Sequence, residues 1–253
     1  MFLMDTNDVL NLNSNGEKQH IVKVNFNTAS ANNYLTNEAY KTLRTNLLFC
    51  GSEIKVIVIT SSQKNEGKST VSTEISKSLA EADKKTILID ADMRKSVLLK
   101  KSIKSHSIRG LSELLSGQAK LCDVLYNTQN PNFDVIFSGH FPPNPVELLA
   151  SENFKNLLSG LREIYDYVII DSPPLSPVID AAVICSVADA AILVISPGNI
   201  RYTEAVSVKE QILKSGCKLL GTVLNNTTPK QTNYYKHYYK GGKYKYYGNK
   251  STK

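Results

Sequence analysis

The stretch KVIVITSSQKNEGKST, residues 55–70, decides the fold. It opens with an unbroken run of β-branched residues, which is typical of a strand buried on both faces of a parallel sheet. Polar residues follow, including an asparagine and a glycine, which tolerate left-handed backbone better than other residues. A segment with helical periodicity then begins at Lys68. The stretch therefore predicts a buried strand, a tight loop and a helix in direct succession.

Strand-like and helix-like segments alternate along most of the chain. We expect strands at 55–61, 85–92, 133–139, 165–174, 189–198 and 218–226. We expect helices at 34–50, 68–82, 110–117, 144–161, 178–188 and 203–216. This alternation predicts an α/β fold with a doubly wound, mostly parallel sheet. Because such sheets bind ligands beyond the carboxyl ends of their strands, we expect the chemistry just after Ser61, Ile89 and Ile170.

The segment SSQKNEGKST, residues 61–70, has the features of a P-loop that binds nucleotide phosphates. In such loops the backbone N–H groups and a helix N-terminus hold the phosphates, the lysine reaches the β/γ oxygens and the hydroxyl binds magnesium. The pattern G-x-x-x-x-G-K-[ST] is met at Gly67, Lys68 and Ser69, but Ser62 holds the first glycine position. Asn65 also stands where glycine is common, and asparagine is the best non-glycine substitute for left-handed backbone.

Acidic residues follow two other predicted strands. Asp90 and Asp92 end the run TILIDAD, and Asp171 ends YVIID. An acid that follows a buried apolar run is costly unless a cation or a hydrogen-bond donor lies there. Three such acids beside a phosphate loop predict a magnesium–nucleotide site.

Together, SSQKNEGKST, ILIDADMR (87–94) and VIIDSPP (168–174) resemble the bacterial tyrosine kinases of capsule and exopolysaccharide synthesis. The resemblance implies a P-loop NTPase architecture of the deviant Walker, MinD/ParA-like type. NEAYKTLRTN (37–46) and GTVLNN (221–226) are also similar to family segments, so the resemblance covers about residues 30–248. Lys41 is a departure, because the family usually has arginine there.

The resemblance implies roles for individual residues, with ATP and Mg²⁺ as cofactors. The ATP phosphates would be held by Asn65, Glu66, Gly67, Lys68, Ser69 and Thr70. Mg²⁺ would be held by Ser69, Asp92 and Asp171. Asp90, assisted by Lys68, would be catalytic and accept the proton of the attacking tyrosine hydroxyl. Glu38, Lys41 and Arg44 would form an inter-subunit contact that builds a ring-like homo-oligomer.

The segment NYYKHYYKGGKYKYYG, residues 233–248, lies in a terminal stretch, 229–253, that contains seven lysines and no acid. This stretch carries the whole net charge of +7, so the rest of the chain is neutral. Its composition predicts a disordered tail. The resemblance implies that the kinase phosphorylates it at Tyr234, Tyr235, Tyr238, Tyr239, Tyr244, Tyr246 and Tyr247. We therefore divide the chain into a mobile arm (1–30), a kinase domain (31–228) and this autophosphorylation tail.

The resemblance also implies partners. No stretch approaches the about 20 apolar residues of a membrane span. The chain is thus similar to the family form in which the kinase is a separate cytoplasmic chain. Its activator would be a transmembrane protein of the polysaccharide chain-length-regulator type, which recruits the kinase to the inner face of the membrane. A cognate tyrosine phosphatase is implied as well.

Two other functions compete with this hypothesis. A partition or positioning ATPase of the ParA/MinD type would have a signature lysine five positions before Lys68, where this chain has Gln63. A nucleic-acid-binding protein could use the lysines and tyrosines of the tail, but the neutral body offers no matching charge. Asn225 and Asn226 end the last predicted strand near the expected position of the base, so one of them contacts adenine or the pair forms a simple turn. The sequence favours the kinase, with no nucleic acid as its main partner.

Overall fold

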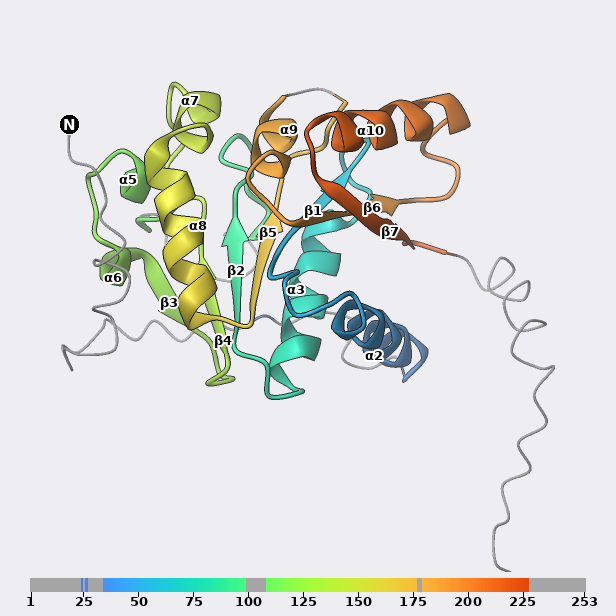
Figure 1. The fold of residues 1–253 in the computed structure, drawn as a ribbon, viewed down its shortest axis with the longest axis horizontal. Coiled ribbons are helices and arrows are strands. Elements are labelled where there is room, and N and C mark those ends of the chain that lie inside the picture. Colours follow the sequence, from blue (N-terminus) through green and yellow to red (C-terminus); the bar gives the residue numbers. More distant parts are fainter. Residues whose placement is uncertain (1–23, 25, 27–33, 99–107, 177–178, 228–253) are drawn as a thin grey trace, which may run out of the picture.

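The computed structural model describes residues 24, 26, 34–98, 108–176 and 179–227. The tail that carries the seven tyrosines and nearly all of the expected N-terminal arm lie outside the described residues. The described part forms a seven-stranded sheet in the order β3-β4-β2-β5-β1-β6-β7 (Figure 1). Every pairing is parallel except that of β3 with β4. The predicted mostly parallel α/β sheet is confirmed.

The strands alternate with helices along the chain. The strands are β1 (Val56–Ser61), β2 (Thr86–Asp90), β3 (Leu125–Asn127), β4 (Phe133–Ile136), β5 (Tyr167–Asp171), β6 (Ala190–Ile195) and β7 (Lys218–Leu224). The helices are α2 (Tyr34–Leu48), α3 (Lys68–Ala80), α5 (Leu111–Leu115), α6 (Leu121–Val124), α7 (Pro145–Leu149), α8 (Glu152–Ile164), α9 (Asp180–Cys185) and α10 (Tyr202–Lys214). No helix in the described segments combines the length and apolar character needed to cross a membrane.

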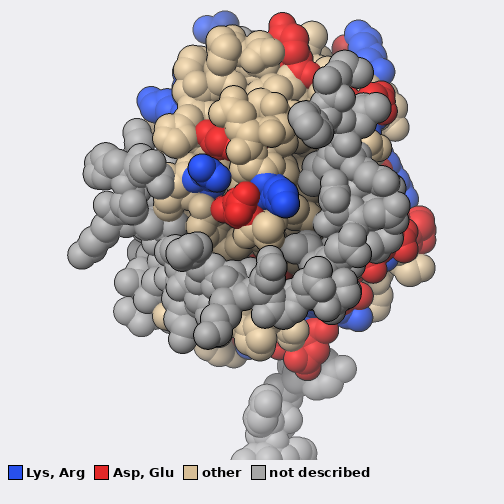
Figure 2. All heavy atoms as spheres, turned by 90° about the vertical axis from the view of Figure 1, so that its left-hand side faces the viewer, with Lys and Arg blue, Asp and Glu red and all other residues tan. Residues whose placement is uncertain are grey.

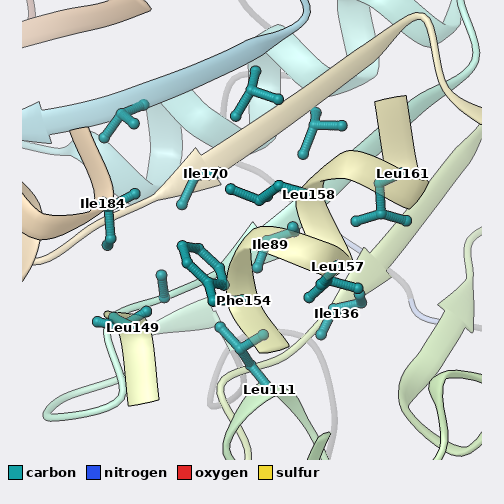
Figure 3. Packing of buried hydrophobic residues seen from close by; sticks show 14 of the residues in the cluster. Ile89, Leu111, Ile136, Leu149, Phe154, Leu157, Leu158, Leu161, Ile170 and Ile184 are labelled. Atoms are coloured by element: carbon teal, nitrogen blue, oxygen red, sulfur yellow. The ribbon is translucent and has the colours of Figure 1, made fainter. Parts of the chain in front are cut away.

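Two hydrophobic cores cover opposite faces of the sheet. On one face, Ile89 and Ile170 pack with Phe154 of α8 and Ile184 of α9 (Figure 3). Burying each such side chain stabilises the fold by about 1.5–3 kcal/mol. The helices on both faces make the sheet doubly wound, as predicted.

The other face packs against α2 and α3. Leu88 and Ile169 point to this face, together with Val71 of α3. Because side chains alternate along a strand, Asp90 and Asp171 share the face of Leu88 and Ile169. Both acids therefore point toward the face on which α3 begins.

Four elements differ from the sequence prediction, and one of them, the four-residue helix α6, was not predicted at all. β3 was not predicted, because it has only three residues and pairs antiparallel at the sheet edge. The helix expected at 144–161 is two helices: α7 ends at Leu149, and Ser151 accepts a hydrogen bond from the Phe154 N–H and so caps α8. The helix expected at 178–188 is shorter and ends at Cys185.

Asp189 ties three elements together at the amino edge of the sheet. Its carboxylate accepts hydrogen bonds from the N–H groups of Lys55 (2.9 Å) and Val56 (2.7 Å). The Arg162 guanidinium at the end of α8 donates two more, at 2.8 and 2.6 Å. Burial alone would raise the pKa of Asp189, but these donors hold it below its ordinary value.

We predict that Asp189→Asn lowers the free energy of unfolding by about 2–3 kcal/mol at neutral pH, because charge-assisted hydrogen bonds are lost. The depressed pKa of the folded state means that this stability is present above the unfolded pKa of about 4 and is lost as pH falls through the folded value. Urea unfolding at neutral and acidic pH measures both effects.

Asp166→Asn is the matched control, because Asp166 accepts one backbone N–H, from Lys85 at 2.8 Å, at the same edge of the sheet. We expect it to cost about 0.5–1.5 kcal/mol. Equal losses for the two variants would contradict the structural role assigned to Asp189.

Candidate active site

The three predicted chemical motifs meet at the carboxyl edge of the sheet. β5 lies between β1 and β2, and its last residue, Asp171, stands in register with Asp90 of β2 and Ile59 of β1. The Ala91 N–H donates to the Asp171 carbonyl at 2.9 Å, so the pairing continues past the strand ends. After β1 the chain crosses in one direction along the sheet to reach β2, and after β5 it crosses in the opposite direction to reach β6. Such a reversal is where open α/β sheets bind ligands.

The phosphate loop lies between β1 and α3 in a strained backbone conformation. Asn65 has a φ of 67° and Gly67 a φ of 88°, both in the left-handed region. The prediction that Asn65 substitutes for a glycine in this conformation is confirmed. A side chain at Gly67 would also collide with Asn225, whose Nδ2 would lie 2.0 Å from the added Cβ. α3 begins at Lys68, directly after this turn, so the N–H groups of its first turn lie at the loop.

Asp171 is buried and surrounded by groups that favour its charged form. Ser72 donates to its Oδ1 at 3.1 Å, and the hydroxyl of Ser69 donates as well. Burial nevertheless raises the pKa of Asp171 to about 6, against the opposing effects of Lys68 and the two serines. The carboxylate therefore lacks full compensation for the water it has lost.

Asp90 is buried more unfavourably still. Burial and the neighbouring Asp171 raise the pKa of Asp90 well above its ordinary value, although Ser96 Oγ and the Asp92 N–H donate to it. The third acid, Asp92, lies 3.6 Å through its Oδ2 from the Nζ of Lys68. The structure thus brings the predicted Lys68, Ser69, Asp90, Asp92 and Asp171 together.

The oxygen donors at this edge fit magnesium bound together with a nucleotide. In the described part of the chain, no group of three or more His, Cys, Asp or Glu side chains is arranged to hold a metal ion. Magnesium usually keeps several waters and takes one or two carboxylates plus phosphate oxygens. A serine hydroxyl beside under-compensated carboxylates satisfies that requirement, since a nearby cation favours their charged forms.

The carboxylate of Glu66 points into the protein, which leaves only the backbone of this residue for the predicted contact with phosphate. Its Oε2 accepts from the Gln63 N–H at 2.8 Å, and its Oε1 accepts from the Ser196 N–H at 3.1 Å. Its carbonyl accepts from Asn225 Nδ2 at 2.9 Å. Asn225 therefore contacts the phosphate loop, a contact that the sequence analysis did not include among its alternatives.

The residues expected at a subunit interface lie on α2. Lys41 pairs with Glu38 at 2.8 Å, and both side chains are exposed. Arg44 instead donates from Nη1 to the Ser78 carbonyl at 2.7 Å and so joins α2 to the far end of α3. Ser78 lies about 15 Å along α3 from Lys68, given the helical rise per residue. The structure thus separates these residues from the phosphate loop.

The flank of the molecule in Figure 2 does not carry a basic face. Figure 2 shows the flank that carries α5, α6, α7 and α8, where much of the described surface is uncharged and lysines and arginines lie singly or beside acids. This agrees with the neutral net charge of the chain without its tail. On this flank, the described residues offer no positive groove for a nucleic-acid backbone.

Comparisons with known proteins agree with the geometry. The AAA domain family matches residues 54–219. The tyrosine-protein kinase CpsD of Streptococcus agalactiae is 41% identical over 218 residues, which are 86% of this chain and 92% of that protein. The kinase domain of Escherichia coli tyrosine kinase ETK matches with a TM-score of 0.73 and 31% identity, over 84% of this chain and 82% of that one. The chimerical protein CapA2B2 matches with a TM-score of 0.71 and 36% identity, over 75% and 84%.

The ATPase alternative is also represented among structures of the same fold. The septum site-determining protein MinD of Pyrococcus horikoshii, complexed with Mg-ADP, matches with a TM-score of 0.58 and 25% identity, over 70% of this chain and 73% of that one. The tyrosine kinases match with higher TM-scores and higher identities. The comparisons therefore favour the kinase over the positioning ATPase.

We predict that Gly67→Ala weakens binding of Mg-ADP by about tenfold or more, because forcing an L-residue into left-handed backbone costs about 1–2 kcal/mol and the new Cβ meets Asn225. Asn65→Gly should bind within about threefold of wild type, since glycine adopts this conformation freely. Calorimetric titration of both variants measures the difference. Wild-type affinity in Gly67→Ala would show that the left-handed turn is not needed for binding.

Proposed function

The chain belongs to the AAA domain family and, within it, to the bacterial tyrosine-protein kinases, and from this premise we propose that it phosphorylates its own tail. The phosphoryl donor is ATP, and the acceptors are the seven tyrosines between 234 and 247. The observation that supports this most strongly is the meeting of the phosphate loop with Asp90 and Asp171 on adjacent strands. The kinase regulates capsular or extracellular polysaccharide synthesis and export.

The chain's own residues divide the work of holding the nucleotide. The backbone from Asn65 to Gly67, with Lys68, Ser69 and Thr70, holds the phosphates, and Lys68 neutralises charge on the β/γ oxygens. Ser69, Asp92 and Asp171 would hold Mg²⁺. When bound, the magnesium ion neutralises charge that develops on the phosphate oxygens. Phosphoryl transfer requires mainly this positioning and charge neutralisation.

Asp90 accepts the proton of the attacking tyrosine hydroxyl. A tyrosine has an ordinary pKa of about 10, so a carboxylate with an ordinary pKa of about 4 is a weak base toward it. Burial and Asp171 raise the pKa of Asp90 and so make its carboxylate a stronger base. With Mg²⁺ held by Ser69, Asp92 and Asp171, the unprotonated form of Asp90 that can accept the proton would be favoured.

The position of β7 supports delivery of the tail to this edge. β7 runs parallel to β6, so the last described residue, Thr227, follows a strand that ends at the same edge as the phosphate loop. From there, about 25 extended residues reach at most roughly 80–90 Å. That reach allows a tail to enter a neighbour's site, and phosphorylation in trans rests on the family.

The proposed partners are those that the family resemblance implies. A transmembrane activator of the chain-length-regulator type recruits the cytoplasmic kinase to the inner face of the membrane, and a cognate phosphatase resets the tail. Each phosphotyrosine adds a charge of about −1.5 to −2. Four or five of them cancel the +7 of the tail. The tail thus works as a charge switch that loosens a ring of kinases held by Glu38, Lys41 and Arg44.

We predict transfer in trans when two full-length variants are mixed with ATP, Mg²⁺ and the cytoplasmic segment of the activator. One variant has an intact active site and all seven tail tyrosines changed to phenylalanine. The other carries Lys68→Met and keeps its tyrosines. Intact mass and peptide mapping should show phosphoryl groups on the tail of the Lys68→Met chain. When the Lys68→Met variant is incubated without the first variant, its tail should remain unmodified.

Asp90→Asn in the first variant should slow the transfer by about 10²- to 10⁴-fold, the usual contribution of a positioned base. If wild type releases phosphate from ATP into solution and its tail carries no phosphoryl group, the kinase proposal is contradicted. Label on wild type but none in the mixture would contradict transfer in trans.

We predict that Lys41→Glu reduces the size of the kinase assembly, measured by light scattering, without changing the melting temperature, because the side chain is exposed. Arg44→Ala should reduce the size and also lower the free energy of unfolding by about 1–3 kcal/mol, since the bond to Ser78 is lost. An unchanged assembly in both variants would remove α2 from the proposed ring interface. If wild type keeps its size on tail phosphorylation, the charge switch is wrong.

A further inference from the structure

Glu66 lies in the middle of the phosphate loop, yet its side chain is completely buried. Its two carboxylate oxygens bind N–H groups from places far apart in the sequence, one at Gln63 in the loop and one at Ser196 after β6. Its carbonyl binds the side chain of Asn225, which directly follows β7. One residue therefore joins the loop to the ends of two strands.

The negative charge of Glu66 opposes the binding of anionic phosphate. Its presence in the loop therefore requires another explanation. The loop is made of backbone conformations that are unfavourable for most residues, since Asn65 and Gly67 on either side of Glu66 are left-handed. Such conformations persist only when surrounding contacts determine them. The hydrogen bonds of Glu66 are contacts of this kind.

We infer that Glu66 is a positioning residue that holds the phosphate loop in its nucleotide-binding shape before the nucleotide arrives. The carboxylate fixes the loop at Gln63 and anchors it to Ser196, and the carbonyl of Glu66 is braced by Asn225. Donors held in place in advance lose less entropy on binding than donors that must be ordered by the ligand. The side chain of Glu66 therefore strengthens phosphate binding without touching phosphate.

The direction in which removal of the carboxylate changes the affinity for nucleotide distinguishes this positioning role from a purely electrostatic one. If the carboxylate acts only as a negative charge in the loop, its removal strengthens binding of an anionic nucleotide. If it acts as a clamp, its removal weakens binding although a repulsive charge has gone. Glu66→Gln keeps the size of the side chain and one acceptor, whereas Glu66→Ala loses both acceptors.

The test is calorimetric titration of the full-length chain with Mg-ADP and, separately, with Mg-pyrophosphate. We expect Kd to rise about fivefold to tenfold in Glu66→Gln and further in Glu66→Ala, for both ligands. Pyrophosphate has no base, so a loss seen with both ligands belongs to the phosphate loop. Glu163→Gln, which removes an exposed acid on α8, is the charge control and should bind as wild type does.

A structural role alone would lower the melting temperature and leave the Kd of the folded protein unchanged, so both are measured on each variant. In the kinase assay, the clamp predicts a higher KM for ATP with kcat at saturating ATP within about threefold. Unchanged or tighter binding in folded Glu66→Gln would overturn the inference.

Asn225→Ala provides a second route if the Glu66 variants do not fold. It should also weaken pyrophosphate binding. The control is Asn226→Gly, which loses the bond to Ser196 Oγ at 3.3 Å but keeps the left-handed backbone of Asn226 (φ 54°) without strain, and it should bind as wild type does. Wild-type pyrophosphate binding by Asn225→Ala would overturn the bracing role. The inference rests on nucleotide binding by the loop and not on the tail as substrate. A chain that binds Mg-ADP but leaves its tail unmodified would refute the proposed function and still test the clamp.

Discussion

The repulsion between Asp90 and Asp171 is the constraint on which the rest of the structure depends. The two acids end adjacent strands in register, and both are buried. Two buried carboxylates on adjacent strands destabilise the folded chain unless hydrogen-bond donors and cations compensate for their charges. Lys68, Ser69 and Ser72 supply part of that opposition at Asp171. Both pKa values stay raised, so the residues around the two carboxylates compensate only in part for their burial.

The two hydrophobic cores allow the chain to tolerate this arrangement. Strands β1, β2 and β5 are buried along their whole length, so apolar packing on both faces holds their carboxyl ends in place. The acids cannot move apart without disturbing that packing, because interiors are as dense as organic crystals. Strain at the carboxyl edge is thus maintained by stability elsewhere in the sheet. A strained site supported by a stable, well-packed scaffold is common where the site must be assembled before its ligand binds.

Sequence patterns predicted the parts of the site that depend on local order. A buried apolar run that ends in an acid places the acid at the carboxyl edge of the sheet, so the sequence alone predicts that Asp90, Asp92 and Asp171 lie close together. The left-handed backbone of Asn65 was also predictable, because asparagine tolerates this conformation better than other non-glycine residues. Strand β3 was missed because three residues at an antiparallel edge carry too little periodicity. The Arg44 bond to Ser78 and the direction of the Glu66 side chain could not be predicted, because each depends on contacts with residues distant in the sequence.

The hydrogen bonds of Glu66 and Asn225 give the root of the tail a direct connection to the phosphate loop. Because β7 ends beside the loop, every tail tyrosine starts its path at the active-site edge of its own subunit. Tyr234 lies only seven residues beyond Thr227 and reaches at most about 25 Å, whereas Tyr247 reaches up to about 70 Å. In the proposed ring, the distant tyrosines therefore have the greater range for entering a neighbouring site.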